Sequence, residues 1–186
     1  MRLVATLLGS CALLVLALAA CADRETRALK FANGQPWSEI LLEDGLAQGR
    51  WRTWYENGQS RADGRYVNGL RNGLWLTWWE NGQKQSDGRY VNGRQDGQWT
   101  HWFASGQMAS QGSFVQGVLE GEWTDWYGDG KKRAQVTFHH GLQDLVVRSY
   151  WPGGALQHEW TYQNGTLDGP YRDFREDGRA PVMGQH

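Results

Sequence analysis

The sequence predicts an all-β fold, an elongated antiparallel sheet of stacked β-hairpins. Tryptophan recurs with a period of 24 residues, and a second tryptophan follows three residues after each member of this series. Turn dipeptides that end in glycine recur with the same period, in two interleaved series. A fixed period of this length is typical of a repeat architecture. Turn signals 11 to 13 residues apart indicate one hairpin per repeat.

The first tryptophan series is Trp51, Trp75, Trp99 and Trp123, and the second is Trp54, Trp78, Trp102 and Trp126. The first turn series is Asn33-Gly34, Asn57-Gly58, Asn81-Gly82, Ser105-Gly106, Asp129-Gly130, Gly153-Gly154 and Asp177-Gly178. The second is Asp44-Gly45, Asn68-Gly69, Asn92-Gly93, Gln116-Gly117, His140-Gly141 and Asn164-Gly165. Asn-Gly and Asp-Gly supply the positive φ angles of type I′ turns, so we expect two-residue hairpin turns.

Residues 1–20 are expected to form a secretory signal peptide. A positive start at Arg2 precedes an apolar run from Leu3 to Ala20, which ends in small residues before Cys21. The run is also about long enough for a transmembrane helix. The small residues and the position of the cysteine favour the signal peptide.

The segment Leu18-Ala19-Ala20-Cys21 resembles the lipobox of bacterial lipoproteins, in which the cysteine is acylated and begins the mature chain. The resemblance implies lipidation of Cys21 and a membrane anchor facing the periplasm of a bacterial envelope. By the sorting rule of that class, Ala22 in place of aspartate implies the outer membrane. We expect residues 21–30 to be the lipidated cysteine and a polar tether, and residues 31–186 to form one repeat domain of about six hairpins.

The charge balance is close to neutral, with 19 Lys and Arg against 20 Asp and Glu. A nucleic-acid partner would require a basic excess, so that class is excluded. If Cys21 is lipidated and Cys11 is removed with the signal peptide, no disulfide is left, and stability must come from packing.

The hairpin register follows from a two-residue turn at Asn57-Gly58. Directly opposed residues share a face of a sheet, and side chains alternate along each strand. Trp51 then opposes Gly64, and Tyr66 opposes Gly49. A large ring over a strand glycine allows close packing of successive hairpins, so these residues are interpreted as structural. The same rule gives Trp75 over Gly88, Tyr90 over Gly73, Trp99 over Gly112 and Phe114 over Gly97.

The rule weakens toward the C-terminus. Trp123 is expected to oppose Val136, and in the fifth hairpin Val147 faces Trp160 while Leu145 faces Tyr162. Volume across each pair is roughly kept, as packing demands. The terminal repeats are degenerate and are expected to act as caps, with Pro181 blunting an edge strand.

The second tryptophan series is expected on the opposite, polar face, with an Arg52–Asp63 pair and with Trp54 beside Arg61. This row, with Arg61 and Arg133, is the candidate binding surface, because Trp and Arg are enriched where proteins bind partners. Rings at these positions could also stack on sugars. A β-bulge or strong curvature would instead bury the row for structural reasons, and both interpretations stay open.

No catalytic or metal site is predicted. No two histidines have the helical spacing of a metalloprotease motif. His139 and His140 are adjacent, and neighbouring strand residues point to opposite faces, so we expect no shared metal. Acidic residues such as Asp63, Asp87 and Glu120 recur in exposed repeat positions, and no glycosidase pair stands out. No cofactor is expected.

Two successive units carry a family resemblance: "GRWRTWYENGQSRADGRYVNG" from Gly49 and "GLWLTWWENGQKQSDGRYVNG" from Gly73. They resemble MORN-repeat variants, as found in bacterial proteins often labelled YwqK-type antitoxins, and the resemblance covers roughly residues 33 to 178. It implies an elongated antiparallel sheet and an interaction module whose partners are proteins and, for some relatives, lipids. It supplies no catalytic residue.

These observations together predict a non-catalytic binding or scaffold lipoprotein of the bacterial cell envelope. A protein partner is expected, in toxin neutralisation or envelope scaffolding. The alternative is a glycan or peptidoglycan ligand on the Trp54 row, and a hydrolase is a remote third. Membrane association is expected through the lipid anchor.

Overall fold

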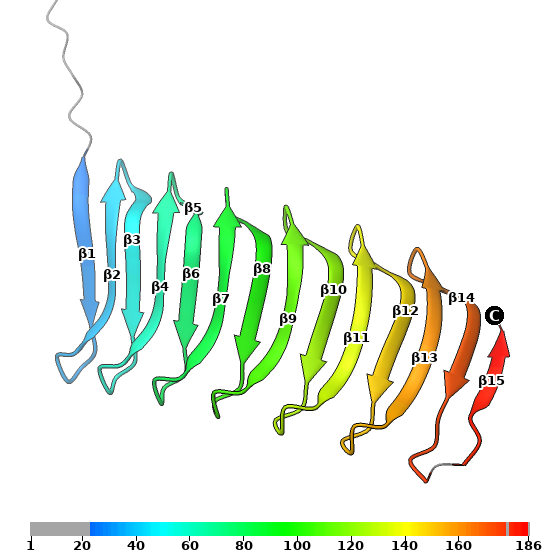
Figure 1. Ribbon diagram of the computed structural model, residues 1–186. Coiled ribbons are helices and arrows are strands. Elements are labelled where there is room, and N and C mark those ends of the chain that lie inside the picture. Colours follow the sequence, from blue (N-terminus) through cyan, green and yellow to red (C-terminus); the bar gives the residue numbers. More distant parts are fainter. Residues whose placement is uncertain (1–22, 178, 186) are drawn as a thin grey trace, which may run out of the picture.

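One antiparallel sheet of 15 strands makes up the computed structural model, which describes residues 23–177 and 179–185 (Figure 1). Sheet order follows chain order from β1 to β15, except that the short β5 pairs only with β4. The described part of the chain contains no helix, and so none that could cross a membrane. The predicted sheet of stacked hairpins is confirmed. The expected signal peptide and Cys21 lie outside the described residues.

The strands are β1 (Arg24–Lys30), β2 (Pro36–Glu43), β3 (Leu46–Trp54), β4 (Ser60–Val67), β5 (Leu70–Arg71), β6 (Gly73–Trp78), β7 (Lys84–Val91), β8 (Arg94–Trp102), β9 (Met108–Val115), β10 (Val118–Trp126), β11 (Lys132–His139), β12 (Leu142–Tyr150), β13 (Leu156–Gln163), β14 (Thr166–Asp173) and β15 (Val182–Gln185).

The segment expected as a tether is largely part of the sheet. Arg24 to Lys30 form β1, which pairs with β2, and the guanidinium of Arg24 donates to Glu43 at 2.8 Å. The tether prediction is therefore wrong for residues 24–30, because their backbone is hydrogen-bonded to β2. Every residue of β1 is exposed, and its charged side chains are typical of an edge strand protected against pairing with other chains.

The second turn series forms type I′ turns, as predicted. Asn68 and Gly69 have φ angles of 49° and 77°, and Val67 pairs with Leu70 across them. The five equivalent turns have positive φ at both central residues as well. These turns form one edge of the sheet, the upper edge in Figure 1, which we call the I′ rim.

From Asn33-Gly34 to Gly153-Gly154 the first turn series forms three-residue loops, so the expected two-residue turns are wrong there. Gly178, in the last member of the series, lies outside the described residues. The Tyr55 amide donates to the Gln59 carbonyl at 2.8 Å, and the Gly58 amide donates to the Tyr55 carbonyl at 2.9 Å. Gly58 has a φ of 84°, whereas Asn57 has no positive φ. The Asn57 side chain instead accepts from the Gln59 amide at 3.0 Å. Asparagine thus serves as an acceptor within a type I turn closed by a left-handed glycine. We call this edge the loop rim.

The longer loop changes the pairing beside it. The predicted register holds from Gly49 opposite Tyr66 to Thr53 opposite Ala62, but Trp54 pairs with Ser60 and not with Arg61. The same shift recurs in the following hairpins. One residue after each loop is therefore bulged, and a bulge redirects side chains.

We call the face that carries Trp51, Trp75, Trp99 and Trp123 the aromatic face, and the other the charged face. Trp51 opposes Gly64 as predicted, but the ring over Gly64 belongs to Trp75 of the next repeat, which a Cβ at Gly64 would overlap. In the same way Trp99 covers Gly88, and Trp123 covers Gly112. The expectation that each ring covers the glycine of its own hairpin is wrong. Each indole instead packs its repeat onto the preceding one.

The glycines Gly49, Gly73 and Gly97 are explained by backbone geometry. Tyr66, Tyr90 and Phe114 oppose them as predicted, but no ring covers these glycines. Their φ angles are 77°, 80° and 78°, and the strand pairing shifts register beside each of the three glycines. Only glycine adopts this conformation without steric cost. These positions therefore require glycine because of their backbone conformation, and not because an aromatic ring covers them, as was expected.

Leu145 occupies the position of these glycines in the fifth hairpin, with a φ of 58°. A left-handed conformation costs a leucine about 1–2 kcal/mol, and its side chain is 61% exposed, so packing recovers little of this cost. We expect Leu145→Gly to raise the free energy of unfolding by about 1 kcal/mol. Urea denaturation followed by tryptophan fluorescence measures the change.

Leu74 provides the matched control, since it is also 61% exposed but has no positive φ. We expect Leu74→Gly to lower the free energy of unfolding by about 0.5–1 kcal/mol, the ordinary cost of glycine within a strand. A loss of stability in both variants would show that Leu145 is not strained.

Hydrogen bonds from side chains join successive repeats along the loop rim. The Tyr55 hydroxyl donates to the Trp78 carbonyl at 2.8 Å, and the same link runs from Trp79 to Trp102 at 2.9 Å and from Tyr127 to Tyr150 at 2.8 Å. Phe103, at the equivalent position, has no donor, and the buried Nε1 of Trp151 has no partner among the described residues. The links couple nearest neighbours only.

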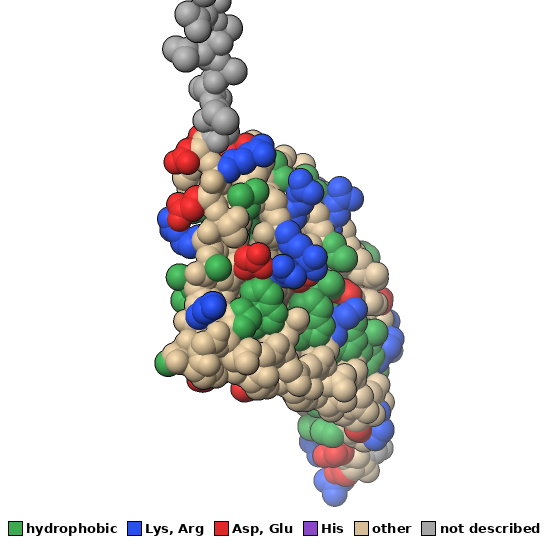
Figure 2. All heavy atoms as spheres, turned by 90° about the vertical axis from the view of Figure 1, so that its left-hand side faces the viewer, with side chains coloured by type: hydrophobic (Ala, Val, Ile, Leu, Met, Phe, Trp, Pro, Cys, Tyr) green, Lys and Arg blue, Asp and Glu red, His purple; other side chains and the backbone are tan. Residues whose placement is uncertain are grey.

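The core is a narrow strip on the aromatic face. Trp75 and Trp99 are 4% and 5% exposed, and Ala62, Thr53 and Ser86 are buried with them. Viewed from the β1 edge, apolar side chains gather midway between the rims, and Lys and Arg side chains lie beside them, mainly toward the I′ rim (Figure 2). Rings lying flat on glycines take the place of a second layer.

Candidate binding face

An unbroken series of ring contacts runs across the aromatic face. Trp and Tyr or Phe alternate, and neighbouring rings meet edge to face. The centroid distances and interplanar angles are 6.1 Å and 82° for Trp51–Tyr66, 5.2 Å and 89° for Tyr66–Trp75, 5.7 Å and 75° for Trp75–Tyr90, and 5.1 Å and 84° for Tyr90–Trp99. This is a favoured geometry for aromatic pairs. The series forms a rigid floor.

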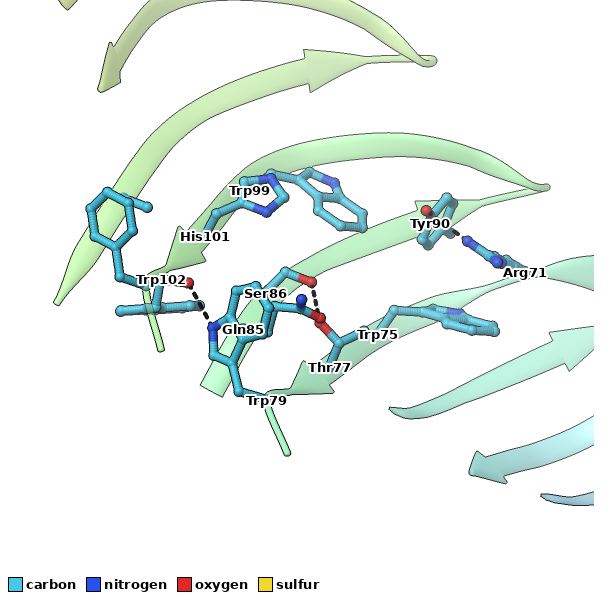
Figure 3. Close-up of a pocket in the computed structure, with 12 residues that line it drawn as sticks. Arg71, Trp75, Thr77, Trp79, Gln85, Ser86, Tyr90, Trp99, His101 and Trp102 are labelled. Atoms are coloured by element: carbon cyan, nitrogen blue, oxygen red, sulfur yellow. Dashed lines mark hydrogen bonds between the residues drawn. The ribbon is translucent and has the colours of Figure 1, made fainter. Parts of the chain in front are cut away.

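Two adjacent hollows lie over this floor, with volumes of about 610 Å³ and 410 Å³. They share Arg71, Trp75, Thr77 and Gln85, so they form one groove across neighbouring repeats. Figure 3 shows side chains of β5 to β8 pointing into the larger hollow from one side of the curved strands. The groove extends to Trp37 on β2.

Arg71 lies where the two hollows meet. Its guanidinium is 4.6 Å from the ring centroid of Trp75 and 5.2 Å from that of Tyr90, and it donates to the Tyr90 hydroxyl at 3.0 Å (Figure 3). Burial disfavours its charge, but hydrogen bonds to the Tyr66 and Tyr90 hydroxyls outweigh this and raise the pKa of Arg71. It is therefore a fixed cation held between aromatic rings.

The bulges bring polar side chains to the same groove. Arg61 is the bulged residue of β4, and its guanidinium lies 5.7 Å from the ring centroid of Tyr55 on the aromatic face. Gln85 is the equivalent residue of β7 and lines both hollows. Arg61, predicted beside Trp54 on the polar face, therefore lies on the other face, because the bulge reverses the alternation of side chains.

The polar centre of the groove is uncharged. The hydroxyls of Thr77 and Ser86 are 2.7 Å apart. His101 lies between Trp99 and Trp123, with ring centroids 6.2 Å and 6.3 Å away. Burial lowers the pKa of His101, so its imidazole is neutral at neutral pH.

A third hollow of about 450 Å³ lies further along the same face, between Phe103 and Tyr127. Arg133 lines it and donates to the Asp125 carboxylate at 2.9 Å. Asp125 also accepts from the indole of Trp123 at 3.0 Å, so Arg133 lies on the aromatic face, contrary to the prediction. The carboxylate neutralises Arg133, which distinguishes this hollow from the groove.

Alternation of side chains along β3, β6, β8 and β10 places the second tryptophan row on the charged face, as predicted, and its residues are half-buried. The Arg52 guanidinium lies 5.3 Å from the ring centroid of Trp54, and Lys84 lies 4.8 Å from that of Trp102. Arg52 makes its ion pair with Glu39 and not with the expected Asp63, which pairs with Arg50. Cations thus lie over two of the four rings, those of Trp54 and Trp102.

The adjacent histidines lie closer together than predicted. The rings of His139 and His140 are 4.1 Å apart, and the Glu120 carboxylate contacts both residues. The positive φ of 50° at His140 places it in a turn, so strand alternation does not apply. Over residues 23–177 and 179–185, no three His, Cys, Asp or Glu side chains gather as a metal site.

The groove thus combines predicted and unexpected residues. Trp51, Trp75, Trp99 and Tyr90 were predicted as structural, and they form its floor. Arg71 was not predicted, because it follows a turn at a position where the other repeats have Ala47, Gln95 or Leu119. Its departure from the repeat is the signal that could have identified it.

Comparison with known families matches the model described as "MORN repeat variant" to residues 47–68, 71–92, 95–116, 119–140 and 143–164. The five matches follow one another through the centre of the sheet and include most of the residues that line the groove, Arg71 among them. No curated protein matches the chain.

Proposed function

Because the chain belongs to the MORN repeat variant family, we propose that it is a non-catalytic binding or scaffold protein that holds a protein partner on the aromatic face. Repeats of this family suggest a repeat-based binding role. The groove around Arg71 supports a protein ligand in particular. It combines a rigid aromatic floor with arginine side chains, the residue types that contribute most to binding between proteins.

A photo-crosslinking residue in place of Gln85 tests this proposal. Gln85 lines both hollows, so a partner in the groove is expected to form one discrete covalent adduct when the full chain is irradiated in cells. Arg89 is the control, because it is exposed on the same strand β7 but on the charged face.

Position 85 is expected to give the adduct and position 89 to give none. Equal labelling from both positions, or adducts only from position 89, would contradict binding in the groove. Mass spectrometry of the adduct then identifies the partner, and shows whether it is a toxin or an envelope component.

Glycan binding by the Trp54 row is the second candidate function. Trp78 and Trp126 are half-exposed, and no cation of the described residues lies over their rings. Strands spaced about 4.8 Å apart place equivalent rings about 10 Å apart. The Trp54 row supports glycan binding less strongly than the groove supports protein binding, because cations already lie over the rings of Trp54 and Trp102.

We also propose that Cys21 carries a lipid anchor on the periplasmic side of a bacterial outer membrane, as the sequence Leu18-Ala19-Ala20-Cys21 suggests. Labelled palmitate should enter the wild-type chain and not Cys21→Ser. Incorporation into both would place the anchor elsewhere.

A further inference from the structure

We propose that the groove binds an acidic, extended peptide segment and that Arg71 and Arg61 hold its carboxylates. This inference names the chemistry of the partner and rests on the protein-binding function proposed above. It depends on the charge of the groove, on the burial of the aromatic rings in its floor and on its length.

The groove contains two arginines without a carboxylate partner. Among the described residues, the side chains that line its two hollows include Arg61 and Arg71 and no Asp or Glu. Neither arginine forms an ion pair in this part of the chain, whereas Arg50, Arg52 and Arg133 each do. The pairing in the third hollow, where Asp125 binds Arg133, shows the contact that the groove lacks.

The geometry of Arg71 fits a carboxylate. A guanidinium has five N–H donors in a planar fork, and tyrosine hydroxyls accept from only part of that set. Stacking near Trp75 and Tyr90 holds the plane of the group in place. A pre-oriented fork loses little entropy when it binds a carboxylate through two parallel hydrogen bonds.

The floor disfavours a sugar at this place. Stacking of a sugar needs an open ring face, and Trp75 and Trp99 are only 4% and 5% exposed. Gly64 and Gly88 lie against one face of these rings, and neighbouring tyrosines approach them edge to face. The rings therefore offer a shaped apolar floor and little free ring face.

The length of the groove fits an extended chain. It extends from Trp37 on β2 to His101 on β8, and these two strands are five strand spacings apart in the sheet. At about 4.8 Å per spacing this is about 24 Å, or about seven residues of extended peptide. Apolar side chains of such a segment can contact the ring edges while its carboxylates face the arginines.

Fluorescence anisotropy with the full chain tests the proposal. The probe is a short labelled peptide in which glutamates alternate with leucine and glycine, and its counterparts carry glutamine or lysine in place of glutamate. We expect the glutamate peptide to bind at least about tenfold more tightly than either counterpart, and to weaken as salt is added. An acidic oligosaccharide, oligogalacturonate, serves as the competing ligand class.

Variants assign the binding to the groove. Arg71→Gln and Arg61→Gln are each expected to weaken binding of the glutamate peptide about tenfold. Arg71→Lys keeps the charge without the fork and should recover part of the loss. Arg89→Gln, on the charged face, should leave affinity unchanged. Unchanged melting of each variant shows that the sheet is intact, and Arg61→Gln keeps the test valid if Arg71→Gln alone fails to fold.

Equal binding of the glutamate and glutamine peptides, equal loss in Arg89→Gln, or binding of oligogalacturonate without the peptide would each overturn the proposal. If the adduct from position 85 persists while the preference for acidic peptide is absent, the protein-binding function stands and only the acidic partner is rejected. Absence of both would reject both.

Discussion

Gly88→Ala is expected to lower the free energy of unfolding by about 3 kcal/mol, although it adds only one methyl group. The new Cβ would overlap the Trp99 indole, and that ring is 5% exposed and packed between Tyr90 and Phe114. Neither the ring nor the strand can move without separating two repeats. Urea denaturation followed by tryptophan fluorescence measures the loss.

Gly128→Ala provides the control for this substitution. Gly128 is exposed, has no positive φ, and a Cβ there would meet no atom within 4 Å. The change in its free energy of unfolding should stay within about 0.5 kcal/mol. Similar losses in the two variants would mean that ring contact is not the reason for glycine at position 88.

Removal of a ring from each tryptophan row should separate their roles. Trp99→Ala is expected to lower the free energy of unfolding by about 3–5 kcal/mol, because a buried indole is lost together with its contacts to Tyr90 and Phe114. Trp102→Ala should cost less than about 2 kcal/mol, because its residue is only half-buried and its ring contacts the long side chain of Lys84. Thermal and urea denaturation of both variants provide the comparison.

The folded Trp102→Ala protein also tests the glycan alternative. Tryptophan fluorescence of the wild type should then be quenched by soluble peptidoglycan fragments, and the quenching should be lost in this variant. Absence of quenching in the wild type would reject a glycan ladder on the charged face. Equal destabilisation by Trp99→Ala and Trp102→Ala would instead favour burial of both rows for structural reasons.

Beyond the bulge beside each loop, the register of the hairpins could be predicted from the sequence, because it follows from the position of the turn and from the alternation of side chains. Trp51 opposite Gly64, Trp123 opposite Val136 and Val147 opposite Trp160 all occur as predicted. The loop type could not be predicted, since Asn-Gly fits both a two-residue turn and the end of a three-residue loop. The bulge beside each three-residue loop places Arg61 and Arg133 on the aromatic face, and not on the charged face as predicted.

The sequence correctly predicted that aromatic rings cover strand glycines, but it paired each tryptophan ring with the glycine of the wrong hairpin. Cross-strand pairing identifies which residues are neighbours within a hairpin, and it contains no information on the direction in which an indole leans. Trp75 leans back onto Gly64 of the preceding repeat. Arg71 could not be predicted for another reason: periodicity reveals residues that recur, and arginine occurs at this repeat position only once.

The hydrogen bonds from Tyr55, Trp79 and Tyr127 reach only as far as the next repeat, which has consequences for folding. Tertiary contacts between neighbours 23 or 24 residues apart keep the contact order low for an all-β chain, so folding can begin at any well-formed pair of hairpins and spread outward. The missing bonds at Phe103 and Trp151 then mark the seams with the weakest coupling. Under load or heat the chain should open there first, leaving the repeats around the Arg71 groove as the last cooperative unit to unfold.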